Sequence, residues 1–141
     1  MEEGQVNSRS FLPGVEIVRG ALVYNEQELA FPGDLLHEAG HIALIPAGLR
    51  ARVSGNVAES QATDGGEEMA VMLWTYAACR FIGIDPEIVF HSGGYKGDSQ
   101  WLLDNYASGT YIGLPLLQWM GLCAGNGQGP DFPDMLKWLR D

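Results

Sequence analysis

The sequence predicts a single, mostly helical α+β domain over residues 1–141, with a small β-hairpin or sheet near its N-terminus. The length of 141 residues is typical of one domain. Two short runs rich in β-branched residues occur close together in the N-terminal part, and segments with helix start and stop signals follow them. The hydrophobic content of 46% and the charged content of 18% are typical of a packed globular protein. Only residues 1–10 are expected to be flexible.

The β-hairpin is predicted over residues 15–24, where the runs VEIV and ALVY flank Arg19-Gly20. The first helix is expected after the turn sequence FPG, with Asp34 as its N-cap. Its sequence, LLHEAGHIALI, supplies about three turns before Pro46 ends it.

A second helix is predicted from Glu67 to a cap at Gly83, after a polar connection over residues 50–66. Acidic residues in its first turn interact favourably with the helix dipole. The same start and stop signals predict further helices after Asp85-Pro86, after Asp98, from Pro115 and, as an amphipathic helix, over residues 132–140.

The motif HEAGH at residues 37–41 is the strongest functional signal, and it contains two of the three histidines. Histidines four residues apart on a helix project from one face, so His37 and His41 can reach the same metal ion. Glu38 lies between them and is placed to act as a general base on a metal-bound water. A chance occurrence of the motif in a helical interaction protein is the competing interpretation.

A third protein ligand must follow if the site is catalytic, and a carboxylate is common in that position. On a helical wheel of the second predicted helix, Glu67 lies within the apolar stripe and Glu68 lies about 100° away. A carboxylate on a core-facing stripe needs a partner or a metal, which favours Glu67 as the ligand. Glu68 is the alternative, Glu59 is a more remote candidate, and solvated acids in the first helical turn are the non-functional interpretation.

These residues resemble the gluzincin metallopeptidases, in which an HExxH helix is followed by a second helix whose glutamate completes a zinc site. The resemblance covers residues 34–82 and includes an ExxA pattern starting at Glu67, with Val71 where an aspartate often stands. It implies a zincin-like domain, a Zn²⁺ ion held by His37, His41 and Glu67, and Glu38 as the catalytic base. The metzincin extension HxxGxxH is absent.

The resemblance also implies a residue that stabilises the oxyanion, since gluzincins often use a histidine or tyrosine for this purpose. His91 and Tyr95 are the candidates, and Tyr76, Tyr106 and Tyr111 are alternatives. The predicted function is a zinc metallopeptidase acting on a peptide or protein substrate. The alternative is a catalytically inactive zincin-like metal-binding or regulatory domain.

The net charge of −10 argues against nucleic acid and anionic lipid surfaces as partners. A basic peptide would be attracted more readily, although ordinary solubility also explains such a charge. No apolar run reaches the length that spans a bilayer, and the N-terminal sequence MEEGQVNSRS lacks the features of a secretion signal. We therefore expect a cytoplasmic protein, and the sequence predicts no oligomeric state. Cys79 and Cys123 are expected to be buried free thiols.

Overall fold

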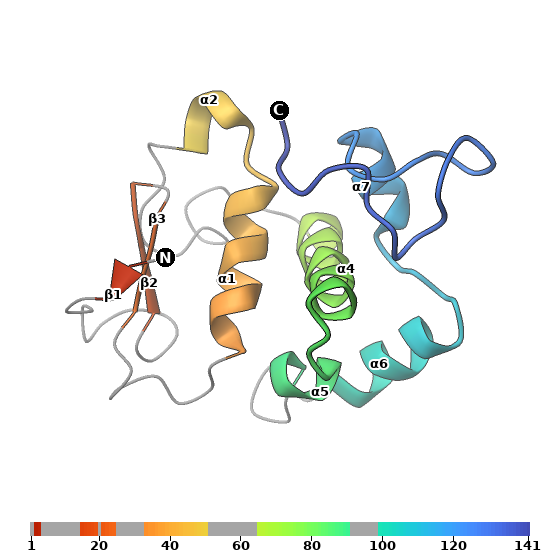
Figure 1. Cartoon of the computed structure of the whole chain (residues 1–141), viewed down its shortest axis with the longest axis horizontal. Helices are drawn as coiled ribbons and strands as arrows, with labels where there is room; N and C mark the ends of the chain where they lie inside the picture. The colour runs from red at the N-terminus through yellow and green to blue at the C-terminus, as the bar shows by residue number, and fades with distance from the viewer. Residues whose placement is uncertain (1, 4–14, 20, 25–32, 51–64, 91–98) are drawn as a thin grey trace.

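The computed structural model of the chain describes residues 2–3, 15–19, 21–24, 33–50, 65–90 and 99–141. These residues are mostly helical, and a small sheet lies at one side of the molecule (Figure 1). The strands are β1 (Glu2–Glu3), β2 (Val15–Val18) and β3 (Ala21–Tyr24). The helices are α1 (Asp34–Ala43), α2 (Ala47–Arg50), α4 (Gly65–Ile82), α5 (Pro86–Val89), α6 (Ser99–Ala107) and α7 (Leu114–Trp119).

The predicted N-terminal hairpin is confirmed, because β2 and β3 pair antiparallel over their full lengths. Arg19, in the connection, has a φ of 48°, in the left-handed region that tight hairpin turns require. β1 pairs parallel with β3 and completes a sheet of order β1-β3-β2, so two of the first ten residues belong to a strand. The sheet contacts α1, and Leu22 of β3 is buried.

The first helix begins one residue earlier than predicted. Gly33, and not Asp34, is the N-cap, and it forms no side-chain cap hydrogen bond. A Cβ on Gly33 would lie 2.4 Å from the carbonyl oxygen of Ile88, so the backbone of α5 approaches this position too closely for any side chain. Asp34 is consequently the first helical residue, and it is buried.

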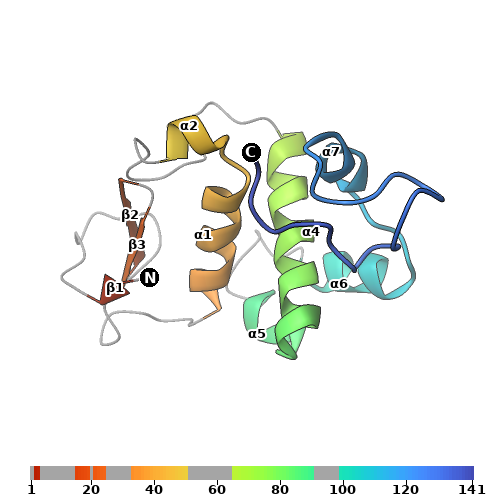
Figure 2. The same cartoon turned by 45° about the horizontal axis from the view of Figure 1, so that its top comes forward.

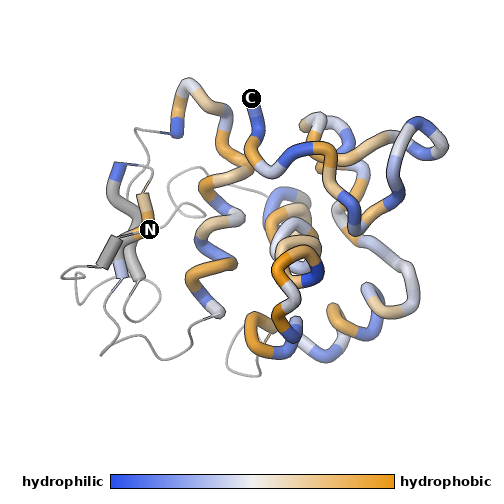
Figure 3. The backbone as a smooth tube through the Cα atoms, in the orientation of Figure 1, coloured by the Kyte–Doolittle hydropathy of each residue, from blue (hydrophilic) through white to orange (hydrophobic). Residues whose placement is uncertain are grey.

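α4 is the central element of the fold, with α1 on one side and α7 on the other (Figures 1 and 2). It starts two residues before Glu67 and ends at Ile82. Gly83 follows with a φ of 87° and donates its N–H to the carbonyl of Cys79, which confirms the predicted glycine cap. Hydrophobic residues recur along α1 and α4 (Figure 3). No helix among the described residues is both long and apolar enough to cross a membrane.

The helices after α4 follow their sequence signals in part. Asp85 is the N-cap of α5 and accepts a hydrogen bond from the N–H of Glu87. Pro115 occupies the first turn of α7, as predicted. Asp98, the expected cap of α6, lies outside the described residues.

The helix predicted over residues 132–140 is wrong, because this segment is irregular and passes over α4 to reach α1 (Figure 2). Its backbone groups bond to distant partners instead of to each other. The N–H of Arg140 donates to the carbonyl of Ala43 at 2.9 Å, and the carbonyl of Trp138 accepts a hydrogen bond from the indole of Trp74 at 3.0 Å. Phe132 is buried and Met135 and Trp138 are partly buried against the core, whereas Leu136 and Leu139 are exposed, so the apolar residues of the segment do not form the buried face of a helix.

Candidate metal centre

The candidate site lies where α1 and α4 pack against each other, and Gly40 allows their close approach. A Cβ on Gly40 would lie 3.0 Å from the Trp74 ring, 3.1 Å from Thr75 Oγ1 and 3.2 Å from a Val71 methyl carbon. These distances are shorter than the 3.5–4.0 Å or so of ordinary carbon contacts. The absence of a side chain at Gly40 thus brings the histidine-bearing face of α1 against α4.

Two histidines and one glutamate converge at this contact. The Nε2 atoms of His37 and His41 are 3.2 Å apart. The two carboxylate oxygens of Glu68 lie 3.3 Å from His37 Nε2 and 3.3 Å from His41 Nε2, respectively. The exposed side-chain fractions are 12% for His37, 7% for His41 and 33% for Glu68, so the group is buried at the imidazoles and open to solvent at the carboxylate.

The spacing of these atoms fits a metal ion. Two ligands bound to tetrahedral zinc at about 2.0–2.1 Å lie about 3.3–3.4 Å from each other. The Nε2–Nε2 separation of 3.2 Å matches that edge length, and a different oxygen of the Glu68 carboxylate lies 3.3 Å from each Nε2. Two imidazole nitrogens also repel at such a distance unless a proton or a cation lies between them. The group could therefore hold a metal ion.

Glu38 is the fourth polar group of the centre. One of its carboxylate oxygens and a ring nitrogen from each of His37 and His41 all lie within 4.8 Å of one another, so these three residues could hold a metal ion. The pKa of Glu38 is raised to about 7, chiefly by burial; the charge of His37 opposes the rise, and the charges of Glu68 and Asp34 contribute to it. A cation bound beside this carboxylate would favour its ionised form.

The other two groups have the protonation states that metal ligands need. The pKa of His41 is lowered to about 4, chiefly by burial and also by the charge of His37, while the charge of Glu68 opposes the shift, so His41 is neutral at pH 7. Burial alone would raise the pKa of Glu68, but a hydrogen bond with His37 and the charges of both histidines outweigh it and lower the pKa. Neutral imidazole and ionised carboxylate are the forms that bind a metal.

The structure brings Glu68, the alternative third ligand, to the histidines, whereas the helical wheel favoured Glu67. The wheel assumed one buried stripe, but α4 is covered on more than one side. Met72, Thr75 and Cys79 are buried on the face that the wheel treated as exposed, and Glu68 shares that face. A centrally placed helix has no single polar face, so only the position of α1 shows which glutamate lies beside the histidines.

The candidates for oxyanion stabilisation are not near the histidines in the described part of the chain. His91 and Tyr95 lie outside the described residues, as does Glu59. The three alternative tyrosines are Tyr76, Tyr106 and Tyr111, and their rings form one cluster with Phe132. This cluster includes residues of α6 and of the loops around α7, on the side of α4 away from α1 (Figure 1).

Comparison of the chain with protein-family models, with curated proteins and with solved structures gave no match. His37, Glu38, His41 and Glu68 are therefore the residues whose chemistry indicates a function.

Proposed function

We propose that this protein is a zincin-like, zinc-dependent hydrolase that cleaves peptide bonds. The observation that carries the proposal is the triangle formed by His37 Nε2, His41 Nε2 and the Glu68 carboxylate, with separations of 3.2–3.3 Å. Two imidazoles and one carboxylate are the protein ligands of a common class of catalytic zinc site, in which one further position remains for water or substrate. The solvent-exposed side of Glu68 is compatible with such access.

In this proposal His37, His41 and Glu68 hold Zn²⁺, which when bound lowers the pKa of a coordinated water and polarises a carbonyl group. Glu38 accepts a proton from the attacking water as its oxygen bonds to the carbonyl carbon. Glu38 then delivers that proton to the amine nitrogen as the carbon–nitrogen bond breaks. The peptide substrate follows from the gluzincin resemblance, and the net charge of −10 favours peptides that carry basic residues.

The metal site is tested by comparing Glu68→Gln with Glu67→Gln, two adjacent substitutions that remove the same charge. Zinc content by elemental analysis and zinc affinity by competition with a chromophoric chelator are measured for both. We expect Glu68→Gln to lower the affinity about 100-fold or more, because it replaces an ionised ligand. Glu67→Gln is expected to stay close to the wild type. A larger loss of zinc affinity in Glu67→Gln than in Glu68→Gln would assign the ligand to Glu67. Wild-type zinc affinity in both variants would remove both residues from the site.

The catalytic role is tested with Glu38→Gln and a mixed peptide library. This variant should bind zinc as the wild type does, while its hydrolysis rate falls about 10²–10⁴-fold, because the proton acceptor is lost. Cleavage by the wild type should stop on treatment with a chelator and return with added zinc. Hydrolysis by Glu38→Gln at the wild-type rate would refute the assignment.

The alternative of a non-catalytic metal-binding or regulatory domain predicts a different combination of results. In that case the protein would bind zinc stoichiometrically through His37 and His41 and cleave no peptide of the library. If His37→Ala and His41→Ala changed neither the metal content nor the stability, the motif would have no metal function.

A further inference from the structure

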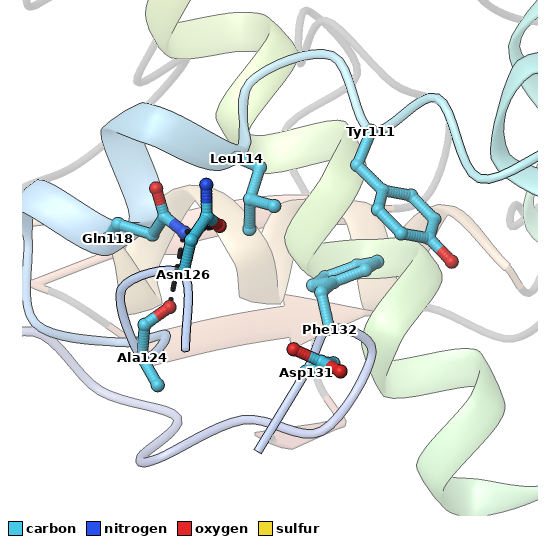
Figure 4. A pocket seen from close by; sticks show the side chains of 7 residues that line it. All are labelled: Tyr111, Leu114, Gln118, Ala124, Asn126, Asp131 and Phe132. Carbon is cyan, nitrogen blue, oxygen red and sulfur yellow. Dashed lines mark hydrogen bonds between the residues drawn. The ribbon is translucent and has the colours of Figure 1, made fainter. Parts of the chain in front are cut away.

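A second site lies on the other side of α4, away from the metal centre. It is a pocket of about 220 Å³ between α7 and the loops that flank it (Figure 4). Its lining residues are Tyr111, Leu114, Gln118, Ala124, Asn126, Asp131 and Phe132. The volume corresponds to about seven water molecules and is below that of pockets for drug-sized ligands. It suits one long side chain or a free molecule of similar size.

One end of the pocket combines a carboxylate with two aromatic rings. Asp131 lies beside Phe132, and the rings of Phe132 and Tyr111 are 4.6 Å apart at 57° (Figure 4). Among the described residues no basic side chain forms an ion pair with Asp131, and none lines the pocket. Aromatic faces and a carboxylate both attract cations, so this end favours a positively charged group.

The opposite end is held by hydrogen bonds that leave an acceptor unused. Nε2 of Gln118 donates to the carbonyl oxygen of Ala124 at 3.1 Å and to Oδ1 of Asn126 at 3.3 Å. These two bonds use both hydrogens of the amide and tie the loop after α7 to the helix. No described residue donates to Oε1 of Gln118, which is left to accept a hydrogen bond from a ligand.

We propose that this pocket binds an organic cation, specifically an alkylammonium or guanidinium group. Asp131 pairs with the charge, Tyr111 and Phe132 contact the alkyl chain and the cation, and Gln118 Oε1 accepts a hydrogen bond. The same chemistry occurs in a free amine and in a lysine or arginine side chain of a peptide. The pocket binds the group without help from the metal centre, because α4 separates the two sites.

The test is a titration of the full chain followed by two-dimensional ¹H–¹⁵N NMR, with n-pentylammonium and with 1-pentanol, its uncharged analogue. We expect shifts around the pocket and at least several-fold tighter binding of the amine. Added salt should weaken this binding, because the pair with exposed Asp131 is screened. A Gly-Lys-Gly peptide and its Nε-acetylated form then separate the two sources of the cation. Binding of the lysine peptide, but not of its acetylated form, would extend the site to peptide side chains. Binding of pentylammonium alone would assign the site to free amines.

Three variants make the assignment specific. Asp131→Asn should lower the affinity for pentylammonium about two- to fivefold, as expected for an exposed ion pair. Asp134→Asn removes the same charge from an exposed residue outside the pocket lining and should leave the affinity unchanged. Tyr111→Leu keeps the apolar contact but removes the ring, and should also weaken binding. Equal affinities for the amine and the alcohol, equal effects of the two aspartate variants, or no shifts around the pocket would overturn the proposal. The spectra themselves report whether each variant is folded.

Discussion

Gly40 is the position at which a single methyl group should disturb both the packing of α1 against α4 and the candidate metal centre. In Gly40→Ala the new Cβ would lie 3.0–3.2 Å from Trp74, Thr75 and Val71. Each contact is about 0.5 Å shorter than an ordinary carbon contact, so α1 and α4 must separate or the side chains must shift. Because Gly40 is within one turn of His37, the shift would also pull the imidazoles away from the Glu68 carboxylate.

The expected magnitude is a balance of two opposing terms. Overpacking a close contact costs about 1–3 kcal/mol. Replacing glycine by alanine inside a helix recovers about 1 kcal/mol. We therefore expect Gly40→Ala to lower the free energy of unfolding by about 1 kcal/mol. Gly48→Ala is the control, since a Cβ at Gly48 meets nothing within 4 Å and the substitution should stabilise by about 0.5–1 kcal/mol.

Urea denaturation of both variants in the presence of a chelator measures the packing effect without metal. Zinc affinity by chelator competition measures the effect on the site, and we expect it to fall about tenfold in Gly40→Ala and to stay unchanged in Gly48→Ala. If Gly40→Ala were as stable as Gly48→Ala and bound zinc as tightly as the wild type, the close approach at Gly40 would not be what holds the site together.

Two further predictions concern the thiols and the C-terminal segment. Burial raises the pKa of Cys79 and of Cys123 to about 11, from 9.0 for an ordinary thiol, so both should react with iodoacetamide at pH 8 about 100-fold more slowly in the native protein than in urea. The folded state holds these protons more firmly, so their contribution to stability is complete below about pH 9 and is lost as the pH rises through about 11, which urea titrations across that range will detect. Arg140→Ala removes a hydrogen bond to the carbonyl of Leu44 and the stacking on Trp119, and should cost about 1 kcal/mol, whereas Arg140→Lys keeps the charge at the helix end and should cost less. An equal loss in both Arg140 variants would show that the charge at the end of α1 does not matter.

The histidine helix could be predicted from sequence because its signals are local. Turn residues precede it, Pro46 follows it, and a four-residue spacing places His37 and His41 on one face. The position of Glu68 beside the histidines could not be predicted from local signals. It depends on which side of α4 meets α1, and the burial of both sides removes the amphipathic pattern on which a helical wheel relies.

The C-terminal segment illustrates the same limit for the fold. Phe132, Met135 and Trp138 are spaced as the apolar face of a helix would be, and that spacing predicted one. In the structure the backbone of the segment instead supplies groups that other elements lack, including a donor for a carbonyl at the end of α1. Such pairing between residues far apart in sequence leaves no periodic signal, so sequence reasoning had nothing from which to infer it.

The contacts of Arg140 with α1 have a consequence for the order in which the protein is made. The carbonyls of Ala43 and Leu44 receive their partners from a residue 96–97 positions later in the chain, and the guanidinium of Arg50 bonds to the carbonyl of Arg140 at 2.6 Å. During synthesis from the N-terminus, the carbonyls of Ala43 and Leu44 at the end of α1 therefore receive these partners only after residue 140 has left the ribosome. Contacts this distant in sequence slow folding, because a long loop must close before they form. These contacts are thus among the last to form, although the helix that they complete is among the earlier segments to be synthesised.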